Sequence, residues 1–253
     1  MEQRGEVERH YAELLAPVYV WMLGGEQAAA ARAKSWVEQR GLAKLAPGIA
    51  VDLGCGPGFH ALALAEWGFE TLAIDTSPEL LAELAARRGN RHVNTVAEDL
   101  IAFEGRLGGL KAKVILCLGD TLPHLASEKQ VDELLDACKR ALAPGGMLAL
   151  TFRDYSTERK PSECLIRVRE DNERSFTCAL EFEPTRVRVT DILHEWRDGR
   201  WSESRSSYSK LRLSPESVRA KLRARGFTLA TDEFAGGLAT ILAIPSGSSK
   251  AIA

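Results

Sequence analysis

The sequence contains no long apolar run. Nowhere do about 18 consecutive apolar side chains occur, the length that a helix needs to cross a bilayer. The first ten residues, MEQRGEVERH, are strongly charged and lack the apolar segment of a secretory signal. We therefore expect a cytoplasmic protein that has no membrane among its partners.

Paired cysteines are also missing. The five cysteines, at positions 55, 117, 138, 164 and 178, form no C-x-x-C pair. An odd number at wide spacing is typical of reduced, buried thiols, and it argues against a disulfide framework or a zinc site. We expect no bound metal.

An excess of charge of one sign is absent as well. The chain has 33 Lys and Arg against 35 Asp and Glu, a formal net charge of −2. This balance provides no electrostatic footprint for nucleic acid, so we expect a small-molecule partner instead. A length of 253 residues with 45% hydrophobic content allows one large domain with a small elaboration.

Between residues 49 and 153 the sequence alternates short apolar segments with amphipathic ones. The pattern predicts strands at 49–53, 69–75, 92–98, 112–119 and 147–153, and helices at 58–68, 77–89 and 127–146. Ser77 and Ser127 occupy N-cap positions, and a Pro-Gly-Gly stop closes the third helix. Such alternation predicts an α/β fold with a doubly wound, mostly parallel sheet that helices cover on both sides.

The two ends of the chain depart from this alternation. Residues 5–45 read as helical, whereas residues 163–213 alternate as antiparallel strands with an Asp-Gly turn. A capped helix at 214–226 and strands at 227–234 and 238–244 follow. We therefore divide the chain into an N-terminal helical lid (1–45), a cofactor-binding core (46–155 and 214–246), an antiparallel β extension over the acceptor site (156–213) and a flexible tail (247–253).

The stretch VDLGCGPGF joins the first predicted strand to the first helix. Its glycines, Gly54, Gly56 and Gly58, allow a tight turn and a close approach of the backbone to a ligand at a helix N-terminus. Asp75 ends the second strand and can accept hydrogen bonds from two ribose hydroxyls. The pattern predicts a site for a nucleoside-bearing cofactor. A dinucleotide is the alternative, although Phe59 stands where the dinucleotide fingerprint requires glycine.

The string DLGCGPG resembles the first motif of class I methyltransferases that use S-adenosylmethionine and release S-adenosylhomocysteine. The resemblance implies a seven-stranded, Rossmann-like sheet and a set of cofactor contacts. Gly54, Cys55, Gly56 and Gly58 would form the loop at the amino-acid end, with Asp52 orienting it and Asp75 holding the ribose. Asp99 would meet the adenine amino group, with Glu98 as its rival, and Ile74 and Leu100 would enclose the purine. Leu118 would complete the cofactor contacts.

The segment CLGDTLPHL, residues 117–125, resembles the glycine/sarcosine N-methyltransferase group, and so does LTFRDYS after the fifth strand. By this resemblance Arg153 would grip a carboxylate of the acceptor and Tyr11 would reach over the methyl donor. His124 would act as a base or orient the acceptor, with a backbone-bonded histidine as the alternative. The antiparallel strands would cover the acceptor.

Two departures from that group bear on the acceptor. Asp120 stands where the group has Asn, and its charge would repel a bound carboxylate, which points away from glycine or towards a cationic amine. Alanines, Ala29 and Ala30, stand where the group has an arginine that pairs with the cofactor's carboxylate, and Arg32 is a candidate substitute.

We therefore predict an S-adenosylmethionine-dependent methyltransferase that acts on a small molecule, at an amine nitrogen. The alternatives are a nicotinamide-dependent oxidoreductase and a non-catalytic module that binds S-adenosylmethionine. A homo-oligomer is compatible with the sequence. We expect His60 at the surface, and Tyr19 and Trp36 in ordinary packing.

Overall fold

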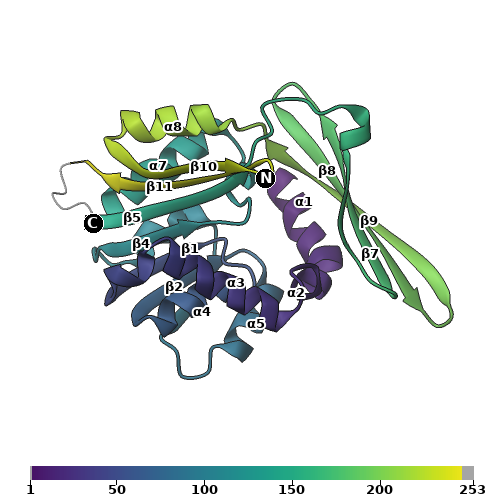
Figure 1. The fold of residues 1–253 in the computed structure, drawn as a ribbon, viewed down its shortest axis with the longest axis horizontal. Helices are drawn as coiled ribbons and strands as arrows, with labels where there is room; N and C mark the ends of the chain where they lie inside the picture. Colours follow the sequence, from purple (N-terminus) through teal and green to yellow (C-terminus); the bar gives the residue numbers. More distant parts are fainter. Residues whose placement is uncertain (1, 247–253) are drawn as a thin grey trace.

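The computed structural model describes residues 2–246, with side chains from residue 5 on, and its largest element is a seven-stranded sheet (Figure 1). The predicted tail lies outside the described residues. The strands are β1 (Gly48–Leu53), β2 (Phe69–Asp75), β3 (Val93–Ala97), β4 (Ala112–Cys117), β5 (Leu142–Arg153), β10 (Phe227–Ala235) and β11 (Leu238–Pro245). Their order is β10-β11-β5-β4-β1-β2-β3, with β11 antiparallel to both of its neighbours and β1 to β5 parallel. The predicted doubly wound α/β fold is confirmed.

Helices cover both faces of this sheet. The helices α3 (Glu26–Gln39), α4 (Phe59–Glu66) and α5 (Pro78–Arg87) pack on one face, and α6 (Phe103–Arg106), α7 (Glu128–Ala141) and α8 (Pro215–Ala224) pack on the other. In β4 successive side chains enter opposite cores, since Val114 and Leu116 face α3 and α4 whereas Ile115 and Cys117 face α7. This explains the unbroken apolar run, because a strand covered on both sides buries every side chain.

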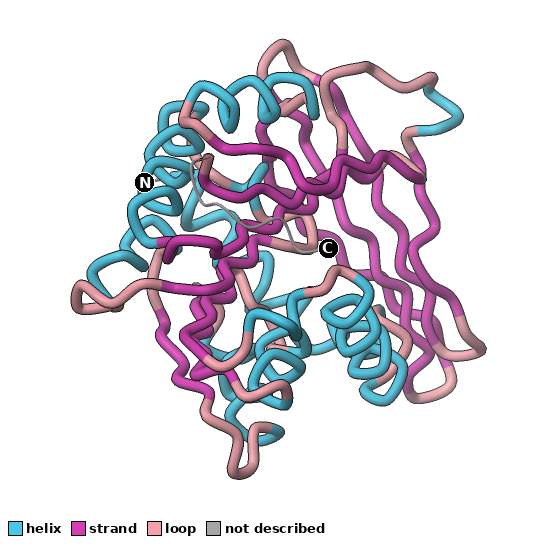
Figure 2. The backbone as a smooth tube through the Cα atoms, turned by 60° about the vertical axis from the view of Figure 1, so that its left-hand side comes forward, coloured by secondary structure: helices cyan, strands magenta, loops and turns pink. Residues whose placement is uncertain are grey.

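A second sheet stands beside the first. It consists of β6 (Leu165–Glu170), β7 (Arg174–Phe182), β8 (Arg186–Arg197) and β9 (Arg200–Leu211), all antiparallel and paired in chain order. Figures 1 and 2 show these long strands to one side of the seven-stranded sheet. The predicted Asp-Gly turn joins β8 to β9, and both of its residues, Asp198 and Gly199, have positive φ.

The N-terminal segment lies between the two sheets (Figure 1). It comprises α1 (Glu2–His10), a π-helical turn (Tyr11–Leu15), a 3-10 turn (Ala16–Val18) and α2 (Tyr19–Met22). Leu14, Leu15 and Val18 pack against Phe176 of β7 and Leu193 of β8. This apolar contact joins the segment to the second sheet.

The observed elements differ from the predicted ones in two places. The helix predicted to reach the Pro-Gly-Gly stop ends earlier, at Ala141, and Pro144 and Gly145 lie inside β5 instead. Residues 100–106, for which we predicted no element, form a 3-10 turn (Leu100–Ala102) followed by α6. No helix between residues 2 and 246 is both long and apolar enough to cross a membrane.

Candidate active site

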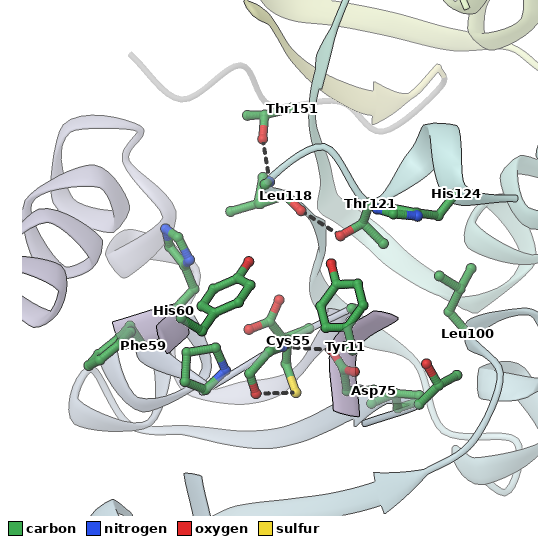
Figure 3. A pocket seen from close by; sticks show the side chains of 18 of the residues that line it. Tyr11, Cys55, Phe59, His60, Asp75, Leu100, Leu118, Thr121, His124 and Thr151 are labelled. Atoms are coloured by element: carbon green, nitrogen blue, oxygen red, sulfur yellow. Dashed lines mark hydrogen bonds between the residues drawn. The ribbon is translucent and has the colours of Figure 1, made fainter. Parts of the chain in front are cut away.

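A cavity of about 670 Å³ opens at the carboxyl ends of β1, β2, β4 and β5. The strand order reverses between β1 and β4, and such a reversal is where ligands bind in open α/β sheets. The glycine loop, the segments after β2, β3 and β4, and the N-terminal segment all contribute to its lining. Figure 3 draws 18 of the lining residues around one space and labels ten of them.

The glycine loop is held close to two neighbouring elements. The amide groups of Gly54 and Cys55 both donate to the carbonyl of Ile74, at 2.8 and 3.0 Å. A Cβ at Gly54 would lie 2.4 Å from Thr121 Cγ2, and one at Gly58 would lie 2.3 Å from a methyl group of Leu84. Two of the three glycines are thus also required by packing within the protein, and one of these two, Gly54, lines the cavity as well.

Asp75 ties the loop to the end of β2. Its Oδ2 accepts a hydrogen bond from the Gly56 amide at 2.7 Å, and its Oδ1 accepts one from the Ser77 amide at 2.9 Å. Burial raises the pKa of this carboxyl above its usual value. The carboxylate also lines the cavity, which places it where it can accept hydroxyl groups of a ligand.

Asp52 lies at the end of β1 and is 3% exposed. Asp52 is one of the residues that line the cavity, and its buried Oδ2 has no hydrogen-bond partner among the described residues. Burial, followed by the charge of Asp75, raises the pKa of Asp52 to about 7. A buried, unpaired carboxylate oxygen is costly unless a ligand satisfies it, so this residue fits the ammonium group of an amino-acid cofactor.

The two rival acids after β3 differ in their partners. Glu98 forms an ion pair with Arg106, at 2.7 and 2.9 Å, and this pairing lowers the pKa of Glu98. Asp99 caps the following turn through a hydrogen bond from the Ile101 amide at 3.1 Å. Both line the cavity beside Leu100, and neither contact excludes a further hydrogen bond to a base.

Tyr11 and Tyr19 bring two phenol groups to the cavity. Their rings stack at 6.3 Å between centroids, and the Tyr11 hydroxyl points into the central space (Figure 3). Burial raises the pKa of Tyr19 to about 12 and that of Tyr11 well above its usual value, so both stay protonated. We had expected Tyr19 to serve ordinary packing, but its ring lies over Gly56, 3.9 Å from where a Cβ would be.

His124 lines the cavity from the turn after β4, a 3-10 segment (Leu122–His124). Its ring stacks on Tyr208 of β9 at 5.2 Å and meets the edge of Tyr11 at 6.1 Å. Burial, then the charges of Lys210 and His10, hold the pKa of His124 well below its usual value. Its Nδ1 is enclosed by the protein and has no hydrogen-bond partner in the described part of the chain.

Asp120 requires a correction. It is absent from the cavity lining and is 7% exposed, because Lys210 of β9 holds its carboxylate at 2.5 Å. The Tyr155 hydroxyl and the Arg153 amide donate to the same carboxylate, at 2.9 and 2.8 Å. The repulsion expected between Asp120 and an acceptor's carboxylate is therefore lost, since a lysine neutralises the charge and the group faces away.

Arg153 is also placed differently from the expected acceptor grip. Its side chain is exposed and does not belong to the cavity lining, whereas Thr151 on the same side of β5 does. Arg153 is the last residue of β5, beyond the point where the strand meets the cavity. Only its backbone takes part, through the hydrogen bond to Asp120.

Sequence reasoning missed part of the lining. His60, which we expected at the surface, packs against Trp36 at 5.7 Å inside the cavity, and burial lowers its pKa to about 4. Arg32, which the sequence did indicate as a candidate, also lines the cavity and donates to the carbonyl of Leu23. His60 follows the glycine loop directly in the sequence, and this position was the one signal that could have placed it at the cavity. Trp36 and Arg32 come from α3, whose placement depends on tertiary packing.

Two further chemistries find no support in the described residues. No group of three or more His, Cys, Asp or Glu there is arranged to hold a metal ion. Cys55 lines the cavity, but burial raises the pKa of its thiol well above the usual value, so it is a poor nucleophile.

Comparisons with known proteins agree with this geometry. A family described as "Methyltransferase domain" matches residues 50–146. A glycine/sarcosine N-methyltransferase of Halorhodospira halochloris is 34% identical over 107 residues, which cover 42% of this chain and 40% of that protein. The chain thus spans well under half of that relative's length. The glycine N-methyltransferase of Mus musculus is 23% identical over 218 residues, 77% of this chain and 73% of that one.

Solved structures show the same fold. An S-adenosylmethionine-dependent methyltransferase from Clostridium acetobutylicum superposes with a TM-score of 0.70 at 17% identity, covering 85% of this chain and 91% of that one. An amino pentose methyltransferase from Micromonospora echinaspora, solved with S-adenosylmethionine bound, gives 0.68 at 18% identity, covering 86% and 92%. Residues 50–146 thus match a methyltransferase domain family, and the described residues share the fold of these solved methyltransferases.

Proposed function

We propose that this protein transfers a methyl group from S-adenosylmethionine to an amine nitrogen of a small molecule. The observation that carries the proposal is a single cavity that extends from the glycine loop to Tyr11 and His124. Its volume of about 670 Å³ is typical of sites for small ligands and cofactors. The cavity therefore has room for a nucleoside cofactor together with a small acceptor.

The lining residues fit the parts of that cofactor. We assign Asp52 to its ammonium group, Asp75 to its ribose, Asp99 to its adenine amino group and Arg32 to its carboxylate. Each assignment pairs a charged or hydrogen-bonding group with a complementary one. The remaining proposed contacts are those of the loop and of the purine walls: Gly54, Cys55, Gly56, Gly58, Ile74, Leu100 and Leu118, all but Gly58 in the cavity lining.

When bound, the cofactor supplies a methyl group that is already activated on a positively charged sulfur. The protein then has to orient the acceptor and exclude water. Tyr11 and Tyr19 from the N-terminal segment cover the space above the loop. The neutral imidazole of His124, which lines the cavity, can form a hydrogen bond with the acceptor.

Relatives support nitrogen as the methylated atom. Two of the similar proteins are named glycine/sarcosine N-methyltransferase and glycine N-methyltransferase, and a similar structure is that of an amino pentose methyltransferase. Those names state the substrates of the relatives and not the substrate of this chain. For this chain, the cavity supports nitrogen as the methylated atom, because its neutral phenol and imidazole groups suit an amine.

Calorimetry with S-adenosylhomocysteine tests the proposal, together with release of that product from S-adenosylmethionine in the presence of an amine panel. Asp75→Asn should weaken binding at least tenfold, about 1.4 kcal/mol, because a charge-assisted contact is lost and the loop loosens. Glu70→Gln, an exposed acid on the same strand, is the matched control and should bind normally. Absence of binding at millimolar ligand would refute the proposal. Binding without turnover of any acceptor would favour the non-catalytic alternative.

A further inference from the structure

Part of the cavity lining is polar but uncharged. Five polar lining residues surround the turn after β4 and the ends of β5 and β11, and we assign none of them to the cofactor. We call this group the acceptor end: Tyr11, Thr121, His124, Thr151 and Thr240. They present one phenol, three hydroxyls and one imidazole. Burial keeps the pKa of Tyr11 high and that of His124 low, so neither is charged near neutral pH.

The basic side chains close to the acceptor end already have partners. Lys210 is 6% exposed, forms the ion pair with Asp120 and lies over the rings of Tyr155 and Tyr208, at 5.9 and 5.6 Å. Arg212 donates to the carbonyls of Tyr155, Ser156 and Glu183. Neither the ammonium group of Lys210 nor the guanidinium group of Arg212 is therefore directed at a ligand.

The charges that do face the cavity are mostly negative. Asp52, Asp75 and Asp99 line it, whereas Arg32 is the single lysine or arginine among its described lining residues. Two like charges 4 Å apart repel by about 1 kcal/mol in water and by about 4 kcal/mol at the effective dielectric of a protein surface. A carboxylate on the acceptor is thus disfavoured, whereas an amine is attracted.

We propose that the acceptor is an amine on an uncharged, hydroxylated skeleton, an amino alcohol in the broad chemical sense, and not an amino acid. This inference rests on the proposed methylation of an amine. The hydroxyls of the acceptor end would exchange hydrogen bonds with hydroxyls of the acceptor, and the imidazole of His124, which lines the cavity, would form a hydrogen bond with its amine group. An acceptor of this kind also differs from glycine and sarcosine, the acceptors that the resemblance to the N-methyltransferase group implies.

The transfer step balances with these groups. The lone pair of the neutral amine forms the new N–C bond, and the C–S bond breaks with its electron pair going to sulfur. The nitrogen then carries one proton too many. The methylated amine keeps this proton as an ammonium group and exchanges it with water after release, so the step needs no base from the protein.

Matched pairs of acceptors test the inference. Ethanolamine is compared with glycine, N-methylethanolamine with sarcosine, and 3-aminopropanol with β-alanine, by the rate of S-adenosylhomocysteine release from S-adenosylmethionine. Each alcohol should exceed its carboxylate partner in kcat/KM by about fivefold or more, the ratio that corresponds to the smaller repulsion above. Equal or reversed ratios would overturn this inference and leave amine methylation standing. If the protein binds S-adenosylhomocysteine but methylates neither member of any pair, the amine proposal fails and this inference fails with it.

A variant provides an independent arm. Arg153→Gln should change the ratio between alcohol and carboxylate by less than about twofold, the usual limit for an exposed substitution, because its guanidinium lies outside the cavity lining. Arg197→Gln, at the tip of the β8–β9 hairpin, is the matched exposed control. If Arg153→Gln selectively removes turnover of the carboxylated acceptors, the arginine grips a carboxylate and the inference is overturned.

Discussion

At the scale of single residues, the carboxylates of the site differ in what already satisfies them. Both oxygens of Asp75 accept backbone amides, so this residue shapes the loop as well as facing the cavity. Asp52 leaves one buried oxygen unpartnered among the described residues. The two acids lie at the ends of adjacent strands, yet only Asp52 depends on a ligand for a full set of hydrogen bonds.

The raised pKa of Asp52 predicts a pH dependence of cofactor binding. With a pKa of about 7, the carboxyl is mostly protonated at pH 6 and mostly ionised at pH 8. If only the ionised form holds the ammonium group, the Kd for S-adenosylhomocysteine should rise about tenfold from pH 8 to pH 6. Calorimetry at both pH values measures this change. Asp52→Asn should bind weakly and with little pH dependence, and an unaltered dependence in that variant would assign the effect to another group.

Residue identity alone located the loop and its acids but misjudged several neighbours. Gly54 and Asp75 have recognisable spacing, because the strand, loop and helix that carry them are contiguous in the chain. Asp120 also lies where the pattern indicated, yet its partner, Lys210, is 90 residues away. Nothing local in the sequence reveals that a distant lysine neutralises a loop acid.

At the scale of elements, the glycine loop determines how closely α4 and α5 approach. Gly58 begins α4 in the left-handed conformation, and Leu84 of α5 fills the space that a Cβ would occupy. Gly54 faces Thr121 in the same way, whereas a Cβ at Gly56 would make only an ordinary contact with Tyr19, at 3.9 Å. The loop is therefore a packing junction as well as part of the binding site.

Substitution of Gly58 by Ala should destabilise the fold more than the same change at Gly89. Both glycines have positive φ, but only Gly58 has a neighbour within 4 Å of the added methyl group. Overpacking adds about 1–3 kcal/mol to the conformational cost that the two variants share. Urea denaturation of both variants measures the difference, and equal losses of unfolding free energy would show that Leu84 moves aside freely.

The pair of Lys210 and Asp120 joins the second sheet to the turn after β4. Lys210→Met leaves the carboxylate of Asp120 buried without its cation, and such a loss typically costs about 3–5 kcal/mol. We expect a large fall in Tm, with partial recovery in the double variant Lys210→Met, Asp120→Asn. Lys129→Met, an exposed lysine of α7, is the control. If the double variant is no more stable than Lys210→Met alone, the unpaired charge is not the cause.

At the scale of the whole molecule, the cavity is assembled from segments that are distant in the chain. Tyr11 comes from the N-terminal segment, Gly56 from the first loop, His124 from the turn after β4 and Thr240 from β11. A ligand in the cavity therefore contacts parts that separate on unfolding. Binding should stabilise the molecule as a unit.

We expect S-adenosylhomocysteine at 100 times its Kd to raise the Tm by about 5–10 °C. This follows from about 2.7 kcal/mol of linkage and about 2–4 °C per kcal/mol for a chain of this size. Differential scanning fluorimetry measures the shift. Asp75→Asn should show a smaller shift at the same ligand concentration, and an equal shift would place the main binding contacts elsewhere.

The sequence by itself determined the order of strands and helices in the core, the glycine loop, and the acids at the ends of β1 and β2. These features depend on contacts between residues near one another in the chain, or on periodicities that reflect burial. Tertiary structure alone decided which side chains face the cavity: it brought in His60 and Tyr19, paired Asp120 with Lys210 and left Arg153 outside. Those outcomes depend on packing between distant segments, and a one-dimensional pattern does not encode which distant groups meet.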